Sequence, residues 1–564
     1  MPYYFFELKL KWLPFFLNDN YYSFLFEDDF KAMIPECFLL FSVCTLLLYG
    51  VSFTSIKQNK IPILATHTSW IAILCIFFTC ILLKNNPIVE AALFYHTFKL
   101  DNLSLFFKML VLVGSLVSIV MSLQYIEQEN LNPFELQTII VIASVSMLFL
   151  ISSADFISIY LAIELQSLCF YVMAGVQRIS EFSSEAGLKY FLLGAFSSGI
   201  LAFGLALQYG FTGTTNLEEL SKIFVAFLST DSFESSSGEI AFGIASLRGC
   251  ELGMIFILVG FLFKLTAVPF HMWAPDVYEG APTSVTAFFA IVPKVAILAV
   301  LVRLCYGGFY DFMFPWQKML ILSCIASMIL GSIAALSQNK IKRLLAWSSI
   351  NHVGYFLIAV CCGTSQSLQA LAFYLVIYLI MTISLFQFVL CSMRRDKINA
   401  FVFDSQKSWS VMPSLLNATT QNEKGSIVTH GRRLKYTTDF AHLAKTNTVL
   451  AITLTITMFS IAGIPPLAGF YSKAFLLFAA MSASQSLLAL VAIITSVISC
   501  FYYIRIVKIM YFEAETVKPP LTFTEISKES SFIFAITLAA LAFFCFFPTP
   551  LFAVTHKMAL SFTF

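Results

Sequence analysis

The stretch GFLFKLTAVPFHMWAPDVYEGAPTSVTAFFAIVPK, residues 260–294, sets two lysines into an otherwise apolar sequence, each close to a proline. Lys264 lies in the run before Pro269, and Lys294 directly follows Pro293. Proline removes a backbone donor and disturbs a helix, so a helix that reaches Pro269 should break there. A charge and a break inside an apolar run are together typical of a membrane span that lines a polar cavity.

The composition of the whole chain agrees with a lipid environment. Of its 564 residues, 59% are hydrophobic and 12% are charged, whereas soluble domains have roughly 45–50% and 25%. No soluble fold can bury so much apolar surface. The net charge of +2 gives no global basic field that would attract nucleic acid. The 13 cysteines show no CxxC spacing, which argues against a metal site and a disulfide scaffold.

The apolar runs predict an all-α polytopic membrane protein with about fourteen transmembrane helices. Each run approaches the 20 residues that a helix needs to cross the hydrocarbon core. The short alternating segments of a transmembrane barrel are absent. The expected spans are 33–53, 61–83, 103–123, 134–153, 155–175, 187–209, 251–268, 282–305, 318–337, 343–362, 368–392, 447–478, 485–510 and 531–547.

Two connections between these spans are long. In residues 210–248 the sequence Thr215-Asn216-Leu217-Glu218 matches a capping box, and it predicts a short amphipathic helix at the membrane interface. The apolar side of that helix would consist of Leu217, Leu220, Phe224, Phe227 and Leu228. The connection 394–445 is polar, with nine Lys/Arg against four Asp/Glu, and it is typical of a flexible insertion.

The charges of the connections predict an orientation. Connections after odd-numbered spans carry the basic groups of 340–343, 394–445 and 505–508. Those after even-numbered spans include the acidic connection 210–248. By the positive-inside rule, the odd connections face the cytoplasm-equivalent compartment and both termini lie on the opposite face.

Ionisable groups inside apolar spans are the candidate functional residues. Each charge at the centre of a bilayer costs about 2.5–3.5 kcal/mol on insertion scales, so a chain that keeps one there has a use for it. The candidates are Glu164, Lys264, Lys294 and Lys473, with His352 as a further candidate for which a hydrogen-bonded packing role is at least as plausible. The alternatives are a structural ion pair for Glu164 and snorkelling to the interface for Lys264 and Lys294. Lys108 and Lys189 lie nearer span ends and are expected to snorkel.

Proton handling is the chemistry that such residues support. Burial disfavours the charged form of a lysine, and a nearby carboxylate restores it. A change in the separation of Glu164 from Lys264 would therefore change the proton affinity of the lysine. With water bridging the gaps, Glu164, Lys264, Lys294 and Lys473 would form a relay across the bundle.

The prolines also predict an internal repeat. Pro269 and Pro465-Pro466 fall in the seventh and twelfth spans, five apart, and broken helices at corresponding places are typical of transporter repeats. The expected organisation is an N-terminal extension with three spans, a first five-helix repeat with the 210–250 loop, a second with the 394–446 insertion, and a last span. Their limits are 1–130, 131–305, 306–512 and 513–564. The turn between the lysines of the first repeat contains His271, Asp276 and Glu279; these are weak evidence for a metal, and we interpret the turn as a rigid connector.

Five segments resemble the antiporter-like membrane subunits of respiratory complex I. They are YLAIELQSLCFY (160–171), SEAGLKYFLLGAFSSG (184–199), residues 260–283, RLLAWSSINHVGY (343–355) and TMFSIAGIPPLAGFYSK (457–473). The resemblance implies a fourteen-helix fold with two inverted five-helix repeats. It implies that Glu164, Lys264, Lys294 and Lys473 carry protons. Two features depart from the family pattern: the first thirty residues are extra, and the 394–445 loop is longer than expected. Both put partner contacts in doubt rather than the proton path.

The resemblance also implies cofactors and partners. The chain would hold no cofactor, while NADH, FMN, iron–sulfur clusters and ubiquinone would belong to the wider complex. Its partners would be other membrane-arm subunits and the lipid bilayer, with protons as its only small substrate. The many Phe residues favour an organelle-encoded protein of the mitochondrial inner membrane, with a bacterial plasma membrane second. A stand-alone cation/proton antiporter is the alternative function, and a scaffold without transport is a third.

Overall fold

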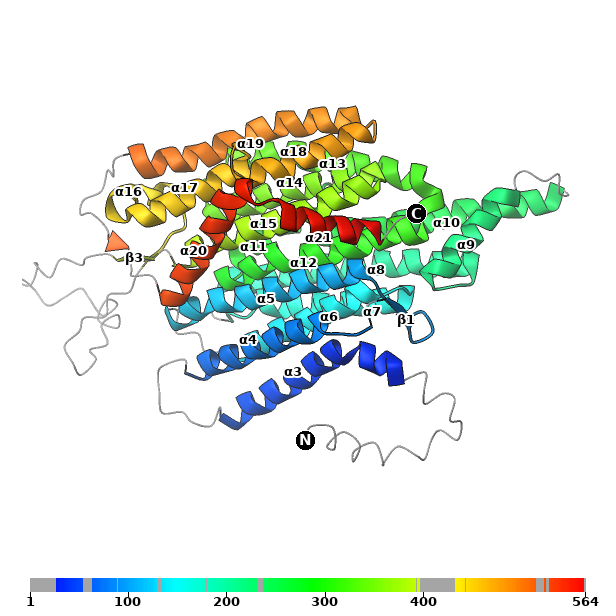
Figure 1. The fold of residues 1–564 in the computed structure, drawn as a ribbon, viewed down its shortest axis with the longest axis horizontal. Coiled ribbons are helices and arrows are strands. Elements are labelled where there is room, and N and C mark those ends of the chain that lie inside the picture. The colour runs from blue at the N-terminus through cyan, green and yellow to red at the C-terminus, as the bar shows by residue number, and fades with distance from the viewer. Residues whose placement is uncertain are drawn as a thin grey trace, which may run out of the picture.

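The computed structural model describes residues 27–561 apart from 54–62, 89, 129–133, 179, 231–236, 392, 396–431, 442, 514–521 and 524–526. This part of the chain is a bundle of long helices that run in roughly one direction (Figure 1). Twelve of the described helices are long and apolar enough to cross a membrane. The long α10 and the pair α17–α18 supply two more crossings, so the prediction of about fourteen spans is confirmed.

The first three spans precede the repeats. A short antiparallel hairpin connects the second span to the third. These elements are α3 (Ile34–Phe53), α4 (Ile63–Lys84), β1 (Ala91–Leu93), β2 (Phe98–Leu100) and α5 (Asn102–Gln128).

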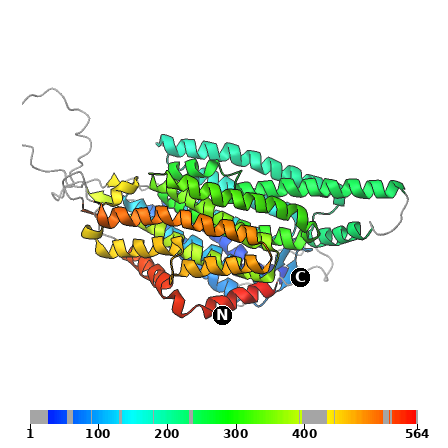
Figure 2. The same cartoon turned by 90° about the horizontal axis from the view of Figure 1, so that it is seen from above.

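The first repeat has five spans, and its fourth is broken between α10 and α11. The spans are α6 (Phe134–Ser152), α7 (Phe156–Ala174), α8 (Glu181–Thr212), α10 (Ser237–Leu265) with α11 (Trp273–Gly280), and α12 (Thr283–Arg303). The short α9 (Leu217–Thr230) lies between α8 and α10. Helices α8 and α10 pack along each other, and α10 extends past the other spans (Figure 2).

The second repeat has the same plan. After η2 (Leu304–Gly308) and η3 (Tyr310–Phe312) come α13 (Met313–Leu336), α14 (Ile341–Cys362), α15 (Ser365–Cys391), α17 (Thr448–Ala462) with α18 (Ala468–Ser482), and α19 (Ser486–Phe512). The fourth span is again the broken one. Because each repeat crosses five times, the second begins at the opposite end from the first, so the repeats are inverted as predicted. The chain closes with α20 (Lys528–Phe543), η6 (Phe544–Phe546) and α21 (Thr549–Leu560).

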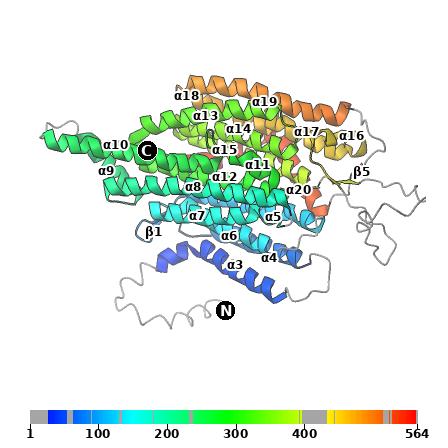
Figure 3. The ribbon, with the colours of Figure 1, turned by 180° about the vertical axis from the view of Figure 1, so that it is seen from behind.

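Small strands mark the two ends of the bundle. One end, which we call the β3 end, carries the sheet of β4 (Arg432–Arg433), β3 (Met393–Arg395) and β5 (Thr522–Phe523). It also carries η5 (Thr437–Phe440) and α16 (Leu443–Thr446), and Lys340 forms a bridge with Tyr436 there. The other, the β1 end, carries the β1–β2 hairpin and α9; the view from behind shows the two groups at opposite ends (Figure 3). The basic connections 340–343 and 432–435 therefore share one end, as the sequence predicted, whereas the predicted flexibility of the insertion concerns residues that lie largely outside those described.

The spans differ in how deeply they lie in the bundle. Every residue in the most apolar window of α12 is buried, and 94% of the window in α14 is buried, whereas the figure for α20 is 22%. A helix that is apolar on all sides is stable only inside the protein or against lipid. The two central helices, α12 and α14, carry Lys294 and His352.

Proline breaks one of the lysine-bearing helices and not the other. Helix α10 ends before Pro269, and Thr266 adopts a positive φ of 65° at the break. Helix α12 continues through Pro293, although a proline there leaves the carbonyl of Phe289 without its helical partner. The Tyr278 hydroxyl donates a hydrogen bond of 3.3 Å to that carbonyl, which is how a neighbouring element can keep a proline-containing span intact.

Helix α9 confirms the predicted amphipathic helix and corrects its cap. The side chain of Asn216, not that of Thr215, accepts the backbone N–H of Glu218, at 2.8 Å. Leu217, Leu220 and Phe224 are buried, and Phe224 stacks on Phe309. This part of the apolar side therefore packs against the protein rather than facing lipid. The side chains of residues 227 and 228 lie outside those described.

Candidate functional site: a buried row of lysines

Glu164 lies on α7 and Lys264 lies on α10. The two residues do not touch, and side chains with hydroxyl groups lie between them. The Lys264 Nζ lies 3.5 Å from the Tyr171 hydroxyl and 5.8 Å from the centre of that ring. Ser167 donates to Glu164 Oε2 at 3.4 Å. The second oxygen, Oε1, is buried without a hydrogen-bond partner among the described residues. The acid and the base therefore lie near the same small group of hydroxyls without forming a direct ion pair, which leaves room for their separation to change.

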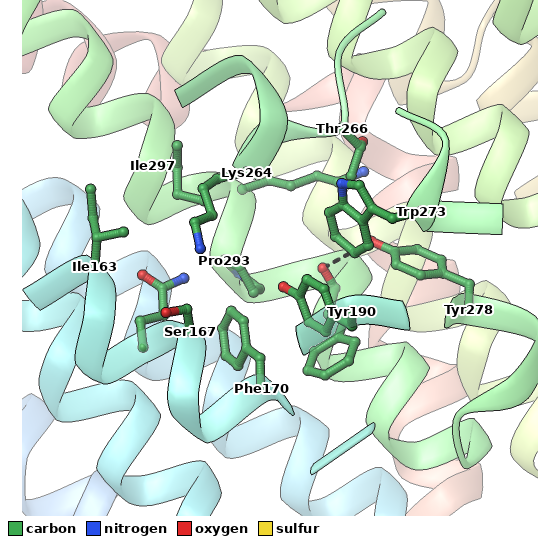
Figure 4. Close-up of a pocket in the computed structure, with 13 residues that line it drawn as sticks. Ile163, Ser167, Phe170, Tyr190, Lys264, Thr266, Trp273, Tyr278, Pro293 and Ile297 are labelled. Carbon is green, nitrogen blue, oxygen red and sulfur yellow. Dashed lines mark hydrogen bonds between the residues drawn. The ribbon is translucent and has the colours of Figure 1, made fainter. Parts of the chain in front are cut away.

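A small cavity connects Lys264 with Lys294 (Figure 4). Figure 4 shows side chains of α7, including Ser167 and Phe170, on one side and those near the break on the other. The space open to the centre of a water molecule is about 20 Å³, and about 10–15 Å³ is enough to hold one water. The walls carry polar groups that such a water needs as partners, among them Gln166 and Thr266.

Lys294 is 2% exposed and lies in the middle of the most buried helix. Its Nζ donates to the backbone carbonyl of Ser349 on α14 at 3.4 Å and lies 5.8 Å from the centre of the Tyr378 ring. No carboxylate pairs with it among the described residues. An ammonium held by one long hydrogen bond and an aromatic face is poorly stabilised in a dry interior, so this lysine is suited to losing a proton.

His352 continues the row on α14 and is 3% exposed. Its Nδ1 lies 2.8 Å from the hydroxyl of Tyr374 on α15. The ring also packs against Tyr355 and Tyr378. A second cavity of about 20 Å³ is lined by Ser349, His352 and Tyr378. The histidine thus lies between the side-chain contacts of Lys294 and those of Lys473, although the sequence alone left its role open.

Lys473 lies just after the second break, on α18. Helix α17 ends at Ala462 and is capped by Gly463, which adopts a positive φ of 88°. The Lys473 Nζ donates to the carbonyls of Ile461 and Ala462, at 2.9 and 3.0 Å, and lies 5.5 Å from the centre of the Tyr355 ring. These carbonyls belong to the last turn of α17, where the helix supplies no donors. The break therefore provides the polar groups that hold this lysine in the membrane.

The structure brings the predicted residues together in one row through the bundle. Glu164 contacts Ser167 and Lys264 contacts Tyr171, one turn further along α7. Lys264 and Lys294 share a cavity, and His352 with its tyrosines lies between Lys294 and Lys473. Sequence reasoning missed the hydroxyl groups that lie between the charges. They are Ser167, Tyr171, Tyr355, Tyr374 and Tyr378. The chain contains 22 tyrosines, so only a position beside a lysine in the folded structure would have marked these residues.

The connector after the first break carries surface charges. Asp276 accepts from Arg343 at 2.6 Å and from Lys189 at 3.2 Å, and Glu279 pairs with Arg343 and Lys340. The connector is thereby tied to α8 and to the start of α14, as expected for a rigid turn. No group of three potential metal ligands occurs in the described parts of the chain. Lys189 lies near the end of its span, as expected, and is about two-fifths exposed.

The expectation for Lys108 was wrong. This residue does not reach the membrane surface; it is fully buried and pairs with Glu36 of α3 at 2.5 Å. The partner lies 72 positions away along the chain, and no local pattern links the two. The pair is separate from the row of lysines described above.

Comparison with known proteins agrees with this geometry. Residues 153–499 match the family described as NADH:quinone oxidoreductase/Mrp antiporter, transmembrane. NADH-ubiquinone oxidoreductase chain 2 of Marchantia polymorpha is 49% identical over 95% of this chain and 99% of its own length. The protein of the same name in Oenothera berteroana is 44% identical over 94% and 99%.

A solved structure shares the fold. Respiratory complex I from Thermus thermophilus with bound aureothin contains a chain with a TM-score of 0.67 and 24% identity, which covers 92% of this chain and 98% of that one. The broken, inverted repeats and the buried lysines define an antiporter-like membrane protein. Within that class, the chain belongs to the NADH-ubiquinone oxidoreductase chain 2 family.

Proposed function

We propose that this chain moves protons across the mitochondrial inner membrane as a membrane-arm subunit of NADH:ubiquinone oxidoreductase. The observation that carries the proposal is the row Glu164, Lys264, Lys294, His352 and Lys473, held inside the bundle with cavities and hydroxyls between its members. Family membership and a fold with at least twelve described spans support the setting.

The separation of Glu164 from Lys264 sets the state of the first lysine. When the carboxylate is close, the ammonium form of Lys264 is stabilised; when it withdraws, burial favours release of the proton. Tyr171 contacts the Lys264 Nζ, so its hydroxyl can accept a hydrogen bond from the ammonium or donate one to the neutral amine. The released proton would pass through the cavity water to Lys294.

The second half of the path lies between Lys294 and Lys473. His352 contributes a ring nitrogen that can accept or donate a proton, and its bond to Tyr374 gives that nitrogen a partner in either form. Lys473 would accept the proton at Nζ, where two backbone carbonyls stabilise the ammonium. Each lysine alternates between amine and ammonium, so no other reactant is consumed.

Redox chemistry would take place elsewhere in the complex. The proposal assigns no flavin, iron–sulfur cluster or quinone to this chain, and it takes other membrane-arm subunits and lipid as partners. Conformational coupling to quinone reduction would then act on the separation of Glu164 and Lys264. A bacterial plasma membrane is the alternative location for a chain of this family.

A stand-alone cation/proton antiporter is the second candidate, because the matching family description covers both kinds of protein. Purification in mild detergent separates the two. The proposed function requires the chain to migrate with NADH:quinone activity in a large assembly, and the isolated chain in liposomes should not exchange sodium for protons. Cation-dependent proton exchange by the isolated chain, with no association with the large assembly, would support the antiporter instead.

A further inference from the structure

A second buried acid–base pair lies outside the row of lysines. Lys108 on α5 and Glu36 on α3 meet at 2.5 Å, with side chains that are 0% and 1% exposed. Their helices belong to the three spans that precede the repeats. A buried pair of this kind is weak evidence for stability, because both ions lose their hydration. Glu36 lies in the first turn of α3, and an ionisable group that is buried inside a membrane span is a functional candidate by default.

The pair has an unused acceptor. Lys108 occupies Glu36 Oε1, whereas Glu36 Oε2 is buried without a hydrogen-bond partner among the described residues. A buried carboxylate oxygen without a partner is costly, and a proton on that oxygen would remove its charge. The geometry therefore provides one position at which the pair can take up a proton while Lys108 remains an ammonium.

The charged residues nearest to Glu36 along the chain are already paired: Lys31 pairs with Glu27 and Asp28, and Asp29 accepts from the backbone N–H of Phe94. The helices that pack on or near α3 are α4, α5 and α6. On the same half of the bundle, α3 contributes Cys37 and α4 contributes Cys80 and Lys84; Cys37 and Lys84 are exposed and Cys80 is partly exposed. Helix α5 contributes Lys108, and Asp101 directly precedes this helix. Helix α6 has its acid, Glu135, in its first turn at the opposite end.

A polar line leads from the pair to the β1 end. Asp101 directly precedes α5, and Ser104 and Lys108 follow it at intervals of three and four, on the same side of the helix. Ser104 and Asp101 hydrogen-bond each other through their side chains and backbone at 2.7 to 3.0 Å. Asp101 also pairs with Arg303 at 2.8 Å, and its side chain is 10% exposed. Asp101 is thus the least buried of the three residues, and the Lys108–Glu36 pair lies further along the helix.

We propose that Glu36 and Lys108 form a proton-binding site of their own, reached from the β1 end through Asp101 and Ser104. A hydronium ion gives its proton to Glu36 Oε2 and is left as water, and the net charge of the pair changes from zero to +1. Release reverses the step, and no other reactant is needed. The site is independent of the proposed relay, because it shares no residue with it.

Infrared difference spectroscopy of the assembled complex tests the site directly. Spectra recorded between a high and a low pH should contain the C=O band of a protonated carboxylic acid that is lost in Glu36→Gln. Because Glu36→Gln leaves Lys108 unpaired and can hinder assembly, the double variant Glu36→Gln/Lys108→Met provides a second measurement without an unpaired buried charge. The exposed pair of Glu27 and Lys31 gives the matched control, Glu27→Gln/Lys31→Met.

The outcomes decide between a proton site and a structural pair. The proposal requires the band to disappear in the double variant and to persist in the control, with the complex assembled in both. A double variant that assembles and retains the full band would overturn it, and the pair would then only fasten α3 to α5. Relay variants at Lys264 should leave this band unchanged, so failure of this proposal and failure of the proposed function are distinguishable.

Discussion

Replacing Gly463 by alanine should displace Lys473 without removing any charge. A Cβ at this position would lie 3.0 Å from Lys473 Cδ and 3.3 Å from its Nζ. These contacts are tighter than nine in ten real Cβ contacts, so the lysine must shift by a few tenths of an ångström. The shift acts on the hydrogen bonds from Nζ to the carbonyls of Ile461 and Ala462.

Two energies contribute to the effect of Gly463→Ala. A left-handed backbone costs a residue with a Cβ roughly 1–2 kcal/mol. Loss of one hydrogen bond from a charged group costs about 1.5–3 kcal/mol, which corresponds to about a tenfold to hundredfold smaller population of correctly placed Lys473. We therefore expect proton pumping to fall by about tenfold or more, and NADH:quinone activity to fall with it if the two are tightly coupled.

Gly213→Ala separates the two energies. Gly213 also follows a helix and has a similar φ of 72°, but a Cβ there would meet no atom within 4 Å. This variant carries the backbone cost alone and should pump normally once assembled. Native gels measure assembly, and acidification per NADH oxidised measures pumping. Equal pumping in assembled Gly463→Ala and Gly213→Ala would refute the role given to the placement of Lys473.

Three other predictions concern the proton path, the docking of α9 and the orientation of the chain. Tyr374→Phe should slow proton pumping in proteoliposomes more than the control Tyr306→Phe. Both variants remove a buried hydroxyl that makes a hydrogen bond, but of the two hydroxyls only that of Tyr374 contacts His352. Equal effects would exclude Tyr374 from the proton path. A hydrogen bond from Lys99 lowers the pKa of Glu218. The pair should therefore stabilise the docking of α9 fully at a pH above the ordinary pKa of a glutamate, about 4.3, and this stabilisation should be lost as the pH falls through the lowered pKa. Amide hydrogen exchange in α9 should become faster at acid pH, and Glu218→Gln should abolish this pH dependence. The substitution should cost less than about 1 kcal/mol at neutral pH, because the pair is largely exposed. A pH dependence that is unchanged in Glu218→Gln would contradict the role given to the pair. Protease added to mitoplasts should not cut the basic 394–445 loop, which the positive-inside rule places in the matrix; cleavage there would reverse the orientation.

The sequence predicts the spans and breaks well because both depend on local chemistry. Apolar length determines where a helix can cross the membrane, and the prolines at 269 and 465–466 lie where the structure interrupts the helices. Pro293 shows the limit of this reasoning. Its helix continues because Tyr278, fifteen positions earlier, satisfies the carbonyl that the proline frees, and such a partner is defined only by the tertiary structure.

Long-range contacts account for what the sequence did not predict. Lys108 is as close to a span end as a snorkelling lysine, but Glu36 from another helix keeps it inside. The four charged candidates were found because a charge in an apolar run is conspicuous. The hydroxyls of Tyr171 and Tyr374 are not conspicuous in that way, and only the packing of α7 on α10 and of α14 on α15 reveals their neighbours.

Lys264→Arg is the variant that tests the central claim most directly, because it keeps the positive charge and removes the ability to release a proton near neutral pH. Proton pumping and NADH:quinone activity are measured on complex whose assembly has been confirmed by native gel. Lys264→Met and Glu164→Gln are measured beside it, and Lys189→Arg provides the same substitution at a partly exposed lysine. The account predicts an assembled Lys264→Arg complex with severely reduced pumping and an unaffected Lys189→Arg complex. Normal pumping by fully assembled Lys264→Arg would contradict the proton relay.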